Sequence, residues 1–182
     1  MNEENSEMVE KCVEMLLNNR YMDIAISQDD NPWVSAVYYA VDPELNFYFV
    51  SLKTSRHGKY IQENSEVALS IYNSTNPPEE ADGIQIDAKA KILEDENLED
   101  SVRTLFSKRF EDEEKQKEYF ENYDEKYAGE SEKKIFKVES ENIYKVSGAY
   151  TRSEVPQEPV KKQLKEIEER KGLGEEHNSR HN

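Results

Sequence analysis

The sequence lacks the features that form disulfide bonds, span membranes or direct secretion. Its 182 residues include one cysteine, Cys12, which excludes an intramolecular disulfide and a cysteine-based metal site. No apolar run approaches the roughly 20 residues that a membrane-spanning helix needs, and the N-terminal residues lack the basic and apolar regions of a signal peptide. We therefore expect a soluble, cytoplasmic protein with no membrane partner.

Positive charge is also scarce. Lys and Arg number 24 against 40 Asp and Glu, which gives a formal net charge of −16 and a pI near 4.7. Such a surface repels nucleic acid and anionic membranes, so neither is an expected partner. An acidic surface is also typical of proteins from a salt-rich cytoplasm, although the abundance of Lys argues against that origin.

Apolar residues recur at helical spacing around the single cysteine, namely Val9, Val13, Leu16 and Leu17. This spacing predicts an amphipathic helix over residues 5–20. It also favours a buried core thiol at Cys12 over a nucleophile.

The remaining periodicities predict a mainly β protein with helices. Strand patterns occupy residues 24–27, 33–41, 47–51, 67–72, 83–93, 134–139 and 143–146. Turn formers at 28–32 join the first two strands as a hairpin. Apolar residues at helical spacing predict a helical insert over 98–127, whose carboxylates and tyrosines we interpret as a solvent face and packing contacts.

Beyond Gly148 the composition turns to Pro, Glu, Lys and Arg, and few apolar residues follow position 160: Leu164, Ile167 and Leu173. We therefore predict one domain over residues 1–150 and a charged tail over 151–182 that is partly helical or disordered. His177 and His181 have the i, i+4 spacing of some metal sites, but no further ligand cluster lies nearby. No metal site is predicted.

The most informative stretch runs from Val50 to Ile61. It contains three Lys or Arg, one His, three Ser or Thr and no carboxylate, inside a strongly acidic chain. A phosphate dianion is bound by an arginine fork, a lysine charge and neutral donors near a helix N-terminus. The side chains that supply those groups are Ser51, Thr54, Ser55, Arg56 and Lys59. The alternative is an ordinary solvated turn.

Three segments together resemble the flavin-binding split barrel of the pyridoxamine 5′-phosphate oxidase-like superfamily. They are Asn31-Pro-Trp-Val-Ser-Ala-Val-Tyr-Tyr, Phe47 through Ser55-Arg56-His57-Gly58-Lys59 to Asn64-Ser-Glu-Val, and Gly83-Ile-Gln-Ile-Asp-Ala-Lys-Ala90. The resemblance covers roughly residues 8–93 and extends more weakly to about 147. It implies an antiparallel six-stranded barrel with an N-terminal helix and a helical insert. It also implies a homodimer that binds FMN in a groove between its subunits.

The resemblance assigns these residues to the cofactor: Ser35, Ala36, Val37, Val50, Ser51, Ser55, Arg56, His57, Lys59 and Gln85. The first three would lie along the flavin ring, and the next two beside the ribityl phosphate. Ser55 and Arg56 match the family's Ser-Arg-Lys, whose Lys is His57 here, and Lys59 matches a second basic position. Gln85 lies on the same strand face as Gly83, which stands where the true oxidase has a flavin-contacting Gln.

The positions that grip pyridoxine phosphate are changed. Ala40 stands where the true oxidase has a substrate-binding Lys, Ser35 replaces an Arg, and the C-terminal Arg-x-His motif is absent. Neutral side chains cannot compensate a desolvated dianion, so vitamin B6 oxidase activity is not expected.

The leading hypothesis is an FMN-dependent oxidoreductase that exchanges hydride or electrons with a small substrate or a reduced nicotinamide. Because the flavin supplies the chemistry, no catalytic residue is named. Trp33, Tyr38 and Tyr39 could stack near the ring, although aromatic residues in strands are more often core or dimer contacts. Three alternatives remain open: a non-catalytic flavin-binding or redox-sensing module, a relative that binds a deazaflavin or haem, and a barrel without a cofactor. The His57 substitution favours the last.

Overall fold

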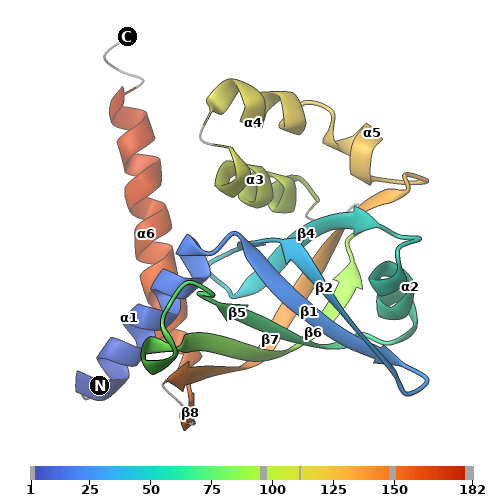
Figure 1. The fold of residues 1–182 in the computed structure, drawn as a ribbon. Helices are drawn as coiled ribbons and strands as arrows, with labels where there is room; N and C mark the ends of the chain where they lie inside the picture. The colour runs from blue at the N-terminus through green and yellow to red at the C-terminus, as the bar shows by residue number, and fades with distance from the viewer. Residues whose placement is uncertain (1–2, 95–97, 111, 148–150, 179–182) are drawn as a thin grey trace.

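The computed structural model describes residues 3–94, 98–110, 112–147 and 151–178. Within them, eight strands form one antiparallel sheet that curls into a half-barrel (Figure 1). The strands are β1 (Tyr21–Gln28), β2 (Asn31–Tyr38), β3 (Ala40–Val41), β4 (Asn46–Leu52), β5 (Glu66–Tyr72), β6 (Asp82–Ile92), β7 (Lys133–Ser147) and β8 (Thr151–Glu154). Their order is β2-β1-β5-β6-β7-β4-β3, and β8 pairs with β7. This confirms the expected split-barrel fold.

The helices are α1 (Glu3–Asn18), α2 (Arg56–Glu63), α3 (Leu98–Arg109), α4 (Glu113–Phe120), α5 (Tyr123–Tyr127) and α6 (Gln157–Asn178), and a 3-10 turn, η1, covers Pro78–Glu80. Helices α3, α4 and α5 lie together over one end of the sheet, α1 and α6 pack against each other, and α2 lies on the opposite side from α6 (Figure 1). The expected N-terminal helix and helical insert are therefore present. None of the described helices is both long and apolar enough to cross a bilayer.

The core follows from the alternation of side chains along the strands. In β1, Met22, Ile24 and Ile26 are buried while the residues between them face outward. These apolar side chains meet those of α1, including Cys12, inside the curl of the sheet. A second apolar cluster lies between α3 and the β3-β4 edge, around Phe106. The thiol is thus buried, as the helical spacing predicts.

Two strand predictions need correction. The predicted strand at 33–41 is interrupted at Tyr39, which is completely buried and donates its hydroxyl to the Leu16 carbonyl at the end of α1, at 2.8 Å. The predicted strands at 134–139 and 143–146 form one strand, β7. A bulge replaces the expected break, because Asp87 faces Asn142 and Ala88 faces Ser140, so one residue of β7 is unpaired.

The C-terminal segment is part of the folded domain and not a loose tail. Strand β8 pairs with β7, and Val155, Val160 and Leu164 are buried in the main core beside α1. The core therefore continues past residue 147, and the predicted boundary at 150 falls outside the described residues. The helical part of the prediction is confirmed by α6. Of the two histidines, His177 is in the last turn of α6 and His181 lies outside the described residues.

Replacement of Leu164 by Ala tests the packing of α6. We expect the free energy of unfolding to fall by about 2 to 5 kcal/mol, because the change leaves a cavity in the core. Urea titration followed by circular dichroism measures this. The exposed neighbour Lys165→Ala is the control and should have little effect. Equal stability of both variants would show that α6 does not hold the core.

Candidate functional site

The basic turn places α2 tightly against the end of β4. Ser55 is the N-cap of α2: its Oγ accepts a hydrogen bond from the Gly58 amide at 3.1 Å and donates one to the Leu52 carbonyl at 2.7 Å. A Cβ on Gly58 would lie 2.5 Å from the Leu52 carbonyl oxygen and 2.9 Å from that of Lys53. Only glycine therefore permits this approach of helix to strand.

The side chain of His57 bridges two strands that are not paired with each other. Its Nδ1 lies 3.1 Å from Ser35 Oγ on β2, and its Nε2 lies 2.7 Å from Ser51 Oγ on β4. These strands are at or next to opposite ends of the sheet order, so the imidazole spans the opening of the half-barrel. The ring edge also meets the stacked rings of Phe49 and Phe136. We call Ser35, Ser51, Ser55 and His57 the serine–histidine cluster.

The hydrogen bonds of the cluster run in one direction. The indole of Trp33 can only donate, and it donates to Ser35 Oγ at 2.9 Å. At the other end the Leu52 carbonyl can only accept, and it takes the Ser55 proton. Ser51, whose Oγ is 3.4 Å from that of Ser55, must then donate there and accept from the imidazole. Nε2 therefore carries a proton, and in the neutral ring Nδ1 accepts from Ser35.

Burial agrees with this assignment. Desolvation lowers the pKa of His57 below its ordinary value of 6.5. The ring is uncharged at neutral pH, so His57 does not replace the fixed charge of the family's Lys. It contributes geometry instead, because it holds the hydroxyls of two strands.

Arg56 supplies the charge of the site. Its guanidinium lies over the Trp33 ring, 4.3 Å from the ring centre, and its Nε donates to the Tyr60 hydroxyl at 3.0 Å. These contacts orient an exposed cation beside the first amides of α2, those of Arg56 and His57, which have no acceptor within the helix. The sequence reasoning treated Trp33 as a possible ring contact of the flavin and did not consider Tyr60. The position of Tyr60, one helical turn after Arg56, is the feature of the sequence that indicates this contact.

The other residues predicted to contact the flavin ring or its phosphate neighbour the cluster in sequence but do not belong to it. Ala36 is exposed, Val37 is buried in the main core and Val50 is half-buried against the second apolar cluster. Lys59 is exposed on α2, and its ammonium has no partner among the residues that the structure describes. Thr54 is also exposed in the turn.

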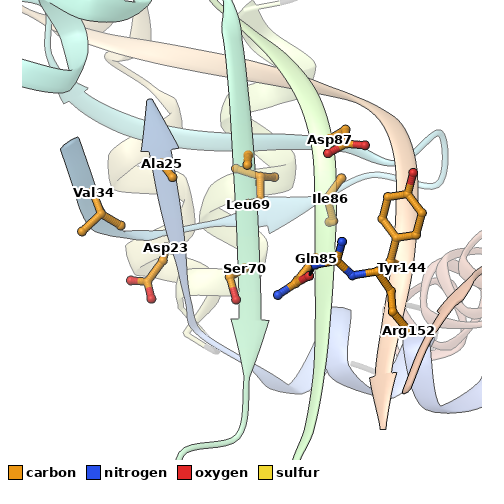
Figure 2. A pocket seen from close by; sticks show the side chains of 11 residues that line it. Asp23, Ala25, Val34, Leu69, Ser70, Gln85, Ile86, Asp87, Tyr144 and Arg152 are labelled. Carbon is orange, nitrogen blue, oxygen red and sulfur yellow. Dashed lines mark hydrogen bonds between the residues drawn. The ribbon is translucent and has the colours of Figure 1, made fainter. Parts of the chain in front are cut away.

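Gln85 is not brought to the cluster. It alternates with the buried Ile84 and Ile86 and so faces outward, whereas Ser35 pairs with the buried Ile24 and faces inward. Strand β6 is also three places from β2 in the sheet. Gln85 instead lines a separate hollow of about 320 Å³ on the outer face, where its Oε1 accepts from Arg152 (Figure 2).

The cluster suits an anion better than it suits bond chemistry by side chains. Beside it lie an oriented guanidinium and two helix-end amides, which are phosphate donors, whereas the serine protons are engaged within the cluster. Both nitrogens of His57 are engaged, so it is not poised as an acid or base. Among the described residues no group of three or more His, Cys, Asp or Glu could hold a metal ion.

The neutral imidazole predicts how stability depends on pH. Because the folded-state pKa is depressed, the unfolded chain takes up the His57 proton first as pH falls below 6.5, and stability is lost there. His57→Gln keeps a donor and an acceptor but does not titrate, so its acid-side loss should be shallower. Urea unfolding at pH 5 to 8 measures the difference between the two proteins. Parallel curves for both would contradict a buried neutral His57.

Comparison with known proteins places this geometry in a family. A family model described as pyridoxamine 5′-phosphate oxidase matches residues 8–147. No curated protein sequence matches the chain. Two solved structures with similar folds are a heme binding protein from Mycobacterium smegmatis, with a TM-score of 0.65 and 13% identity, and General Stress Protein 26 from Bacillus anthracis, with a TM-score of 0.54 and 17% identity.

Coverage differs between these two neighbours. The match to the mycobacterial structure covers 85% of this chain but only 60% of that protein, whereas the match to the Bacillus protein covers 81% of this chain and 99% of the other. At such identities the likeness shows the fold alone. The family model, which spans most of the chain, carries the assignment. The chain belongs to the pyridoxamine 5′-phosphate oxidase family.

Proposed function

We propose that the protein binds FMN through the turn before α2 and acts as a flavin-dependent oxidoreductase. The observation that carries the proposal is the oriented Arg56 beside the N-terminus of α2 and the serine–histidine cluster, in a chain of this family. Bound FMN would supply hydride or electron exchange with a small substrate or a reduced nicotinamide. A deazaflavin that carries the same phosphate end is the alternative cofactor.

The residues fit a phosphate ester, except that His57 adds no charge where the family has a Lys. Arg56 supplies the fork, and the first amides of α2 supply neutral donors. Ser51 and Ser55 donate their protons within the protein and therefore position the turn. Lys59, one turn further along α2, supplies a second exposed charge. His57 holds the serine hydroxyls in place instead of adding charge, so we expect weaker phosphate binding than a Lys at this position would give.

We also propose that the site is completed by a second copy of the chain. Apolar side chains next to the cluster are unusually exposed: Trp33 at 38%, Val34 at 58% and Leu52 at 45%. Exposed apolar groups gathered at one place are typical of contact surfaces. A homodimer that buries them would form a groove along β2 beside the phosphate site, as the family resemblance implies.

Two other activities lack support at this site. Ala40 is buried under α3, so it offers no grip on the phosphate of a vitamin B6 substrate. The mycobacterial neighbour is described as heme binding, but His57, the one histidine whose side chain the structure describes, already uses both ring nitrogens. We therefore favour a flavin over haem.

The double replacement of Arg56 and Lys59 by Ala tests the phosphate assignment. We expect FMN to bind about 10 to 100 times more weakly, because charge-assisted hydrogen bonds contribute about 1.5 to 3 kcal/mol each. Quenching of FMN fluorescence on titration measures the affinity. Lys162→Ala with Arg170→Ala removes the same charge from exposed positions of α6 and is the control. An unchanged affinity in the first variant would remove the assignment.

Turnover separates an enzyme from a flavin-binding or redox-sensing module. The loaded protein should oxidise reduced nicotinamide in the presence of an electron acceptor, and the loss of absorbance at the nicotinamide band measures this. Retained flavin without turnover would favour the non-catalytic alternative, which the neutral His57 also permits.

A further inference from the structure

A second hollow lies at the C-terminal end of β2, where the end of α3 and the start of α4 line it together with Arg20 and Tyr38. Its volume is about 410 Å³, and it is lined by four cations, two aromatic rings and one carboxylate. The cations are Arg20, Lys108, Arg109 and Lys115. We call this the cationic hollow. Such a gathering is notable in a chain whose formal net charge is −16.

The cations of the hollow outnumber its one carboxylate and form no ion pair with the residues that the structure describes. In the described part of the chain, none of the four takes part in an ion pair, whereas cations elsewhere on the same two helices do. Arg103 of α3 pairs with Glu99, and Lys117 of α4 pairs with Glu121. The lining carboxylate, Asp112, already caps α4 by accepting hydrogen bonds from two of its amides. Four cations therefore face a single carboxylate in the hollow, which leaves an excess of positive charge.

Lys108 is the deepest of the four. Its ammonium donates to the Leu16 carbonyl at 3.1 Å and lies 3.7 Å from the centre of the Tyr39 ring. Burial, with a smaller effect of Lys171, lowers the pKa of Lys108 to about 7. An amine placed in this way is costly to charge, and a bound anion would favour its charged form.

The walls are partly apolar. The Tyr38 ring centre lies 5.8 Å from the Arg109 guanidinium carbon, and Phe110 also lines the hollow. A ligand that fills the hollow thus meets cations and aromatic surface together. An inorganic anion would interact with the cations alone.

We propose that the cationic hollow binds a small organic anion, with its carboxylate or phosphate among the four cations and its apolar part against Tyr38 and Phe110. The site uses no residue of the serine–histidine cluster and stands independently of flavin binding. The ion-paired cations of α3 and α4 do not line the cationic hollow, so they are suitable controls.

Titration of the wild-type protein with benzoate, compared with inorganic phosphate, tests the proposal by calorimetry and by backbone amide shifts. Benzoate should bind more tightly than phosphate and shift the amides of Tyr38 and Arg109. In Arg109→Gln with Lys115→Gln, we expect benzoate affinity to fall at least about tenfold. Arg103→Gln with Lys117→Gln, which removes the same charge from the same helices, should bind as the wild type does.

Equal weakening in both double variants would overturn the proposal, because it would show a general charge effect. Shifts confined to residues 51–59 would also overturn it, since they would place the anion at the α2 turn. The Arg56→Ala/Lys59→Ala variant should keep its benzoate affinity even if it loses FMN. Failure of the flavin proposal and failure of this one are thus told apart.

Affinity should also depend on pH in a defined direction. Benzoate stays anionic between pH 6 and 9, so weaker binding with rising pH would report deprotonation of Lys108. The affinity should fall about tenfold if the bound anion raises the pKa of Lys108 by one unit. Lys108→Met should bind weakly with no such dependence. A wild-type profile that is flat, or one that Lys108→Met retains, would overturn the role of Lys108. Other charged groups that line the hollows on either side of Lys108 are Arg20, Arg109, Asp112, Lys115, Glu168 and Lys171.

Discussion

A single imidazole joins the two ends of a sheet that does not close through its own backbone. His57 reaches Ser35 on β2 and Ser51 on β4, and α2 carries it into place because Gly58 lets the helix lie against the Leu52 carbonyl. The split of the barrel is thus bridged by side chains. The same contact fixes the start of α2, and with it the amides and the Arg56 guanidinium that form the proposed phosphate site. Fold and site depend here on one set of hydrogen bonds.

The bridge explains why a histidine can stand in this turn. A lysine would bring charge but only one flexible donor group, whereas a neutral imidazole donates on one side and accepts on the other. The His57 ring lies against Phe49 and Phe136 and contacts two serine hydroxyls. Burial in these surroundings favours its uncharged form. The trade between charge and rigidity is resolved in favour of rigidity, and Arg56 retains the electrostatic role.

Much of this could be read from the sequence, and the rest required long-range contacts. Periodicity of two and of 3.6 gave the hairpin, the first helix and the helical insert, because each is a local pattern. The packing of α6 was missed, although Val160, Leu164 and Ile167 have helical spacing, because the surrounding charge resembles a disordered tail. Gln85 was assigned to the right strand and, by the family resemblance, to the flavin, but strand order cannot be deduced from alternation. The cationic hollow joins Arg20 to Lys115, which no local pattern connects.

The contact of α1 with α6 joins a segment that precedes all the strands to one that follows them. Val9 and Leu16 near the start share one core with Val160 and Leu164 near the finish. During synthesis α1 and the barrel strands emerge before α6, so the apolar face of α1 has no complete partner until α6 has left the ribosome. Such late, long-range closure is slow in folding. The nascent sheet therefore spends the time of translating the last helix with part of its interior exposed, when it is most open to chaperones and to aggregation.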